Sequence, residues 1–237
     1  MDNYCEHKTN DVFIIINELD TRDLDIRVLE LGEKQPSTLK YEKSEAYGQD
    51  GYTKVSEDAY RGFERTSIVM VNNLTAYNEF IDTIYPGLDV SITYSDDSGR
   101  SRFGTIQDID DVVIIGDNRQ ITITVDLQPF QYAEEINETF LEPASIDNIG
   151  NVYAVPYIEI VGNGHIELVV NDKVMRLDVD ESIIIDNVMY DVYDKNGLRA
   201  NSRRLEGDFI RLKPGSNGID FTGDVSEVNI SVSWRWR

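Results

Sequence analysis

Cysteine and histidine are nearly missing from this sequence. Its 237 residues include one cysteine, Cys5, and two histidines, His7 and His165. A single thiol excludes a disulfide framework and a thiolate metal cage within one chain. Neither histidine lies in a His-x-x-x-His or similar metal spacing, so histidine catalysis has little support. We expect His165 to be an exposed residue at the start of a strand.

Long apolar runs are also missing. No segment approaches the roughly 18 consecutive apolar residues of a membrane span. The first seven residues, Met-Asp-Asn-Tyr-Cys-Glu-His, have neither the basic stretch nor the apolar core of a secretory signal. We therefore expect a soluble protein that stays in the cytoplasm and does not insert into a membrane.

Positive charge is scarce. Lys and Arg number 22 against 44 Asp and Glu, which gives a formal charge of -22. Phosphate backbones are repelled by such a charge, so no stable nucleic-acid binding is expected. The acidity either maintains solubility or lines a channel past which DNA must slide, and the sequence leaves both interpretations open.

Catalytic motifs are absent as well. The sequence has no Gly-x-Ser-x-Gly elbow, no phosphate-cradling glycine-rich loop and no dinucleotide fingerprint. Acidic clusters are the remaining candidates, because a glycoside hydrolase needs only two well-spaced carboxylates. Three clusters occur: Asp96-Asp97; Asp108, Asp110 and Asp111; and Asp178, Asp180 and Glu181. None matches a calcium-binding loop. We predict no catalytic residue, no metal and no cofactor, and therefore no enzyme.

The hydrophobic pattern of the first half is mainly that of β-strands. Strands are predicted near 12–16, 24–31, 66–71, 88–94, 102–106, 112–115 and 121–127. Helical spacing appears once, at about 74–85, where Leu74, Tyr77, Phe80, Ile81 and Ile84 share one face before Pro86-Gly87. We predict a mainly β, sandwich-like N-terminal domain over 1–135 with one helix.

The second half alternates almost without interruption. Apolar residues recur at every second position in segments such as Ile166–Val170, Met175–Val179 and Val228–Trp236. Asn163-Gly164 and Asn196-Gly197 are typical of two-residue hairpin turns. Short antiparallel strands at this spacing predict a β-sandwich over 136–237, with the domain boundary somewhere within 128–150.

Two tryptophans near the end of the sequence allow two interpretations. Trp234 and Trp236 continue the apolar face that begins at Val228, which favours core packing with Arg235 and Arg237 facing outward. Aromatic rings can also stack on sugars, so a carbohydrate-binding β-sandwich module is the alternative function.

Residues 32–65 show hardly any periodicity and are predicted to form a long loop. Such loops tend to be functional or disordered. Aromatic residues alternate with charge in this segment, a composition that suits a surface buried against another chain. The candidate subunit-interface residues are Tyr41, Tyr47, Tyr52, Tyr60, Arg61 and Phe63. Packing of these aromatics on their own domain is the alternative.

Several short motifs occur in a characteristic order. Tyr60–Arg65 runs into a strand, Gln128-Pro-Phe-Gln-Tyr132 stands at the domain junction, and Leu212-x-Pro214-Gly215-x-Asn217 precedes the last strand. Gly150-Asn-Val-Tyr-Ala-Val-Pro156 opens the second domain. With one helix between two strand series, this order resembles the distal tail proteins of long-tailed bacteriophages and prophages. The resemblance covers nearly the whole chain.

The resemblance implies an assembly function. It implies a homohexameric ring of N-terminal domains at the end of the tail tube, with galectin-like C-terminal sandwiches outside it. The implied partners are the tail-tube protein, a tail-tip or tail-associated protein and, in many phages, a receptor-binding protein. The expected location is the virion tail tip.

Overall fold

The computed structural model describes residues 12–45, 47–48, 50–97 and 99–237. Cys5 and His7 lie outside the described residues. The chain divides into two compact units, the first ending at Gln131 and the second spanning Tyr132–Trp236. The division falls within 128–150, where the sequence places the domain boundary. Each unit has its own hydrophobic core.

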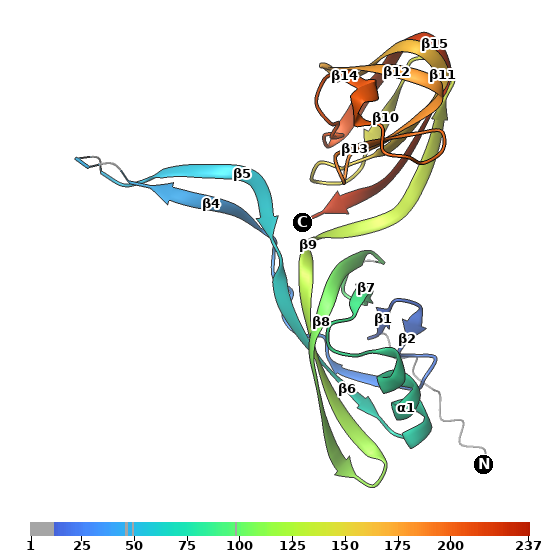
Figure 1. The fold of residues 1–237 in the computed structure, drawn as a ribbon. Coiled ribbons are helices and arrows are strands. Elements are labelled where there is room, and N and C mark those ends of the chain that lie inside the picture. The colour runs from blue at the N-terminus through green and yellow to red at the C-terminus, as the bar shows by residue number, and fades with distance from the viewer. Residues whose placement is uncertain (1–11, 46, 49, 98) are drawn as a thin grey trace, which may run out of the picture. The chain divides into compact units, whose positions relative to one another are not determined.

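The first unit is an antiparallel β structure with one helix (Figure 1). Strand β9 (Asn118–Phe140) lies between β6 (Phe63–Val71) and β8 (Ser101–Ile115). The sheet continues from β8 to its outer strands on one side and from β6 to β3 on the other. These further strands are β7 (Asp89–Tyr94), β1 (Ile14–Ile16), β2 (Leu19–Asp20) and β3 (Arg27–Glu30).

The core of the first unit follows from strict alternation. In β6 every second residue is buried, from Phe63 through Val69 and Val71. In β9 the buried set includes Ile121, Ile123 and Val125. Because successive strand residues point to opposite faces, these side chains all lie on one side of the sheet.

Helix α1 (Leu74–Thr83) is the one α-helix in the described part of the chain, which confirms the predicted mainly β class with a single helix. Its N-cap is Asn73, whose side chain accepts a 2.7 Å hydrogen bond from the backbone N–H of Ala76. Ile84 then adopts an extended conformation and ends the helix. Phe80 and Ala76 are the buried residues of the helix.

Removal of the helix cap gives a first prediction. Asn73→Ala should destabilise the first unit by about 1 kcal/mol, because a helix-end N–H loses its acceptor. Urea denaturation measures the loss, and Asn73→Ser should restore most of it. Equal destabilisation by both substitutions would show that the cap contributes nothing.

The prediction of an irregular loop over 32–65 is wrong. Strands β4 (Thr38–Ser44) and β5 (Thr53–Arg61) form an antiparallel hairpin here, and β6 begins at Phe63. Figure 1 shows the hairpin as a two-stranded ribbon that leaves the sheet of its own unit. In β4 only Leu39 is partly buried. A ribbon exposed on both faces needs no apolar alternation, so its sequence lacks the usual strand signal.

The second unit consists of antiparallel strands without an α-helix among its residues. Its strands are the final part of β9, from Tyr132 to Phe140, and β10 (Ala144–Asn148), β11 (Tyr157–Val170), β12 (Lys173–Asp186), β13 (Asp191–Asp194), β14 (Arg204–Glu206) and β15 (Gly215–Trp236). A 3-10 turn, Asn201–Arg203, precedes β14. The main order is β13-β12-β11-β15, with β10 paired to β15 and β14 paired to β12. The predicted alternation of β15 is confirmed, since Val228, Ile230, Val232 and Trp234 are buried.

One predicted turn of the second unit is wrong. Asn163-Gly164 lies inside β11, at a shift of its register with β15, and does not join two strands. The β11–β12 turn is at Asn171, whose φ is 54°. The neighbouring strand explains why residue 162 is a glycine. A Cβ on Gly162 would lie 2.2 Å from the carbonyl oxygen of Asp224. Glycine here permits close approach of two strands, not a hairpin turn.

Candidate assembly surface

The β4–β5 hairpin, called the arm below, exposes lysines and tyrosines on one face. Lys43 and Lys54 lie directly opposite each other in the hairpin register. Like charges directly opposite each other repel. The two ammonium groups therefore turn apart, and each lies over a tyrosine ring of the opposite side of the hairpin. Lys43 Nζ is 4.5 Å from the ring centre of Tyr52, and Lys54 Nζ is 4.4 Å from that of Tyr41. Tyr41 remains 40% exposed and Tyr52 50% exposed.

Contacts with β9 fix the root of the arm. The Ser37 hydroxyl donates to the carbonyl oxygen of Pro129, and the ring of Tyr60 packs edge-on against Phe130 at 5.2 Å. The predicted junction motif at 128–132 therefore contains the residues against which the root of the arm packs. Gly62 connects the arm to β6 and lies very close to β9. A Cβ at this position would be 2.2 Å from the carbonyl oxygen of Leu127.

The six predicted interface residues divide into three groups. Tyr41, Tyr47 and Tyr52 are exposed on the arm, and Arg61 is exposed at its end. Tyr60 is half-buried at the root, against Phe130. Phe63 belongs to the core, where the Arg102 guanidinium lies 5.2 Å from its ring centre. Phe63 therefore packs on its own domain and is not part of the candidate surface.

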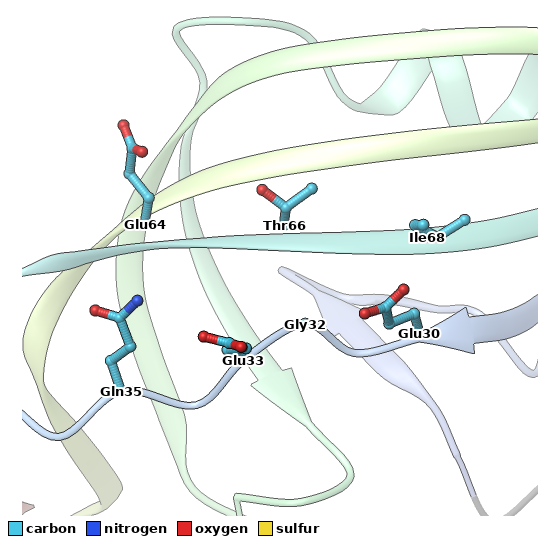
Figure 2. A pocket seen from close by; sticks show the side chains of 7 residues that line it. All are labelled: Glu30, Gly32, Glu33, Gln35, Glu64, Thr66 and Ile68. Atoms are coloured by element: carbon cyan, nitrogen blue, oxygen red, sulfur yellow. The ribbon is translucent and has the colours of Figure 1, made fainter.

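An open groove of about 490 Å³ lies beside the root of the arm. We call it the acidic groove, and its lining residues are Glu30, Gly32, Glu33, Gln35, Glu64, Thr66 and Ile68. Figure 2 shows the β6 residues opposite those of the segment that leads from β3 toward the arm. The three carboxylates give this side of the first unit an acidic character that complements the lysines of the arm.

A buried ionic cluster lies under the root of the arm. Its centre is Asp97, whose side chain is 0% exposed. Oxygen Oδ1 is 2.7 Å from Lys34 Nζ and accepts from Gln131 Nε2, while Oδ2 is 3.3 Å from Arg102 Nε. Arg65 Nη1 is 3.8 Å from Oδ2, and Arg65 Nη2 donates to Asp96 at 2.8 Å. The Asp97 cluster thus comprises Lys34, Arg65, Asp96, Asp97, Arg102 and Gln131.

Burial shapes the acid–base behaviour around this cluster. Desolvation raises the pKa of the nearby Tyr94 hydroxyl to about 12, although Arg65 acts in the opposite direction. The Arg65 guanidinium lies 3.9 Å from the Tyr94 ring centre. Desolvation also lowers the pKa of Arg102, and Asp97 opposes the change. Arginine keeps its charge at neutral pH, so the cluster is ionic.

Members of each of the three acidic clusters considered as catalytic candidates are engaged by neighbouring side chains. Asp96 and Asp97 are bound by the arginines described above. Asp111 accepts hydrogen bonds from Tyr77 and Arg119. Glu181 pairs with Lys195, as does Asp180, which is also 3.7 Å from Arg203. These carboxylates are held in ion pairs and hydrogen bonds.

No metal-binding arrangement occurs in the part of the chain that the structure describes, where no three His, Cys, Asp or Glu side chains come together as ligands. His165 is exposed, as predicted, but lies within β11 and not at a strand start. Its Nδ1 is 3.9 Å from Asp178. None of the described helices is long and apolar enough to cross a membrane.

Trp234 is not available as a sugar platform. Trp234 is 3% exposed and belongs to the core of the second unit, and Trp236 packs against that core partly buried. The core-packing interpretation is therefore the right one for Trp234. The burial of Trp234 removes one of the two rings that motivated a carbohydrate-binding function.

The two-unit β architecture is similar in fold to a solved hub protein of a phage adsorption apparatus. The solved structure is that of the SPP1 Dit (gp 19.1) protein, described as a paradigm of the hub adsorption apparatus in phages that infect Gram-positive bacteria. The TM-score is 0.75 at 18% sequence identity, and the match covers 95% of this chain and 99% of that one. The predicted resemblance is thereby confirmed at the level of the fold.

Comparison of the sequence with protein families and with curated proteins gives no match. The likeness therefore rests on three-dimensional structure. At this identity it establishes the fold alone.

Proposed function

We propose that the chain is a distal tail protein, a structural and non-enzymatic component of a phage or prophage tail tip. The observation that carries this proposal is the match of both units, in order, to a phage hub protein over nearly the full length of each chain. We infer a homohexameric ring formed by the first units. The ring joins the tail-tube protein to a tail-tip or tail-associated protein and supports a receptor-binding protein.

The inferred location is the virion tail tip, after assembly in the bacterial cytoplasm. Six copies at -22 each give a ring with a charge of about -130. Such a ring repels phosphate, so DNA can pass without adhering. Under this proposal the negative charge lines the channel for DNA, in addition to maintaining solubility.

We infer that the arm of one copy docks in the acidic groove of its neighbour. Charge complementarity supports this contact, because the arm presents Lys43 and Lys54 whereas the groove presents carboxylates. Segment 38–61 carries four basic and five acidic residues, a net -1, within a chain of -22. The arm is therefore only weakly negative, and another copy repels it little.

The arm cannot occupy its own groove. Glu33 and Gln35 precede β4, and Glu64 follows β5 by three residues, so the chain segments that form the groove continue directly into the arm. The seven residues of β4 extend about 20 Å from that root. An arm that leaves one groove and enters the next makes a head-to-tail contact, and such contacts form a closed ring when the rotation between copies divides a full turn.

Charge reversal tests this contact. The arm variant Lys43→Glu with Lys54→Glu, and the groove variant Glu33→Lys with Glu64→Lys, should each weaken self-association at least about tenfold, since like charges then meet across the interface. An equimolar mixture should recover assembly, because each reversed arm meets a reversed groove and each native arm a native groove. Sedimentation velocity and electron microscopy, with tail-tube subunits present, measure the result.

The matched control is Lys173→Glu with Lys213→Glu, which reverses two exposed lysines of the second unit and should leave assembly unchanged. Arm and groove variants that assemble like the native protein would reject both surfaces. A mixture as deficient as the separate variants would reject the pairing of arm with groove and leave the ring to other contacts.

A further inference from the structure

Asp97 connects parts of the first unit that are far apart in sequence. Its backbone is held in the turn after β7, where its N–H donates to the carbonyl oxygen of Tyr94 at 2.9 Å. Its buried carboxylate then meets Lys34 from the segment before the arm, Arg102 from β8 and Gln131 from β9. One carboxylate thus joins four chain segments.

Both chain segments that form the root of the arm belong to this arrangement. Before the arm, Lys34 reaches Asp97 and also donates to the carbonyl oxygen of Asp96 at 3.0 Å. After the arm, Arg65 donates through Nε to the carbonyl oxygen of Leu31 at 2.8 Å and through Nη2 to that of Gly32 at 3.3 Å. Arg65 therefore links β6, which follows the arm, to the segment that precedes it, next to Asp97.

The opposite side of the cluster lies at the end of the first unit. Gln131 is the last residue of that unit along β9, and Tyr132 is the first residue of the second unit. Gln131 is 5% exposed and donates to the same carboxylate oxygen that binds Lys34. A single atom, Asp97 Oδ1, thus links the root of the arm to the strand that continues into the second unit.

We propose that Asp97 is a positioning residue that couples the root of the arm to Gln131 within β9, so that docking of the arm is transmitted to the point where the second unit begins. The significance of this coupling for a tail tip rests on the proposed function, whereas the coupling itself is a property of the isolated chain. Separating a buried charge from its partners is costly, so the cluster moves as one body.

Hydrogen exchange of the full-length chain, measured by mass spectrometry, tests the coupling without any ring. The informative variant is Lys34→Met, because the exposed lysine contacts Asp96 and Asp97 but is seen in no contact with β9 among the described interactions. Amide exchange should become at least about tenfold faster in two separate places, residues 31–45 and residues 128–134. The core strands β11 and β12 should keep their native protection.

Asp97→Asn should produce the same pattern with a larger amplitude, and Lys34→Arg should restore native exchange in both places. The matched control is Asp111→Asn, which removes a carboxylate held by Tyr77 and Arg119 outside the cluster. If Asp97→Asn does not fold, Lys34→Met and Lys34→Arg still decide the question. Faster exchange confined to the arm, no change at all, or a uniform increase throughout the first unit would each overturn the proposal.

Discussion

Replacement of Arg65 by methionine is expected to lower the free energy of unfolding of the first unit by about 3–5 kcal/mol. Methionine keeps an apolar stem but removes a charge that is 0% exposed and bound to Asp96. The carbonyl oxygens of Leu31 and Gly32 also lose their donor. The buried Asp97 carboxylate also loses a nearby positive charge, since Arg65 Nη1 lies 3.8 Å from its Oδ2, which is why the expected loss is large.

Differential scanning calorimetry of the whole chain measures this loss. Because each unit has its own core, the transition of the first unit should move while that of the second stays in place. The matched control is Arg176→Met, which removes an exposed arginine paired with Glu167 and Glu206 and should shift neither transition. An unchanged first transition in Arg65→Met would show that the cluster contributes nothing to stability.

Truncation of Trp234 to alanine is expected to destabilise the second unit by about 3–5 kcal/mol, because a large buried ring leaves a cavity that the neighbouring strands cannot fill. Trp234 continues the buried face that Val228, Ile230 and Val232 form on β15. The same substitution should leave the first transition unchanged.

Trp236→Ala provides the comparison for Trp234, since its ring is only partly buried. The loss should be clearly smaller than that of Trp234→Ala. Urea denaturation followed by tryptophan fluorescence in each single variant measures both. A Trp234→Ala variant as stable as the native protein would place the ring outside the core and favour the sugar-platform interpretation.

The sequence predicts the elements that bury one face and expose the other. Strand β15 is an example, because Val228, Ile230, Val232 and Trp234 point inward while their neighbours face outward. Helix α1 is another, because its apolar spacing ends at a proline-glycine pair. In both cases the core imposes a periodicity that is visible in the residue types.

The strands of the arm could not be predicted from the sequence, for the opposite reason. It buries neither face, so its residues carry no periodic constraint, and only its aromatic content indicates an interface. The arrangement of Lys43 and Lys54 over tyrosines depends on the hairpin register, which the sequence does not reveal.

The Asp97 cluster could not be predicted from the sequence because its arginines interrupt the alternation of apolar and polar residues. Arg65 and Arg102 occupy inward positions of β6 and β8, where alternation predicts apolar residues. Charged residues at such positions are a usable signal for a buried ion-pair network. Their partners, Lys34 and Gln131, are too distant in sequence for any local pattern to connect them.

Electron microscopy of negatively stained particles tests whether this chain forms the proposed hub ring of a phage tail tip. Concentrated protein, alone and mixed with tail-tube subunits of the same particle, should yield six-fold rings. Rings that are lost in the arm variant and recovered in the mixture with the groove variant would identify the contact that closes them. Absence of any ring with the tube partner, while both proteins are folded, would contradict the account.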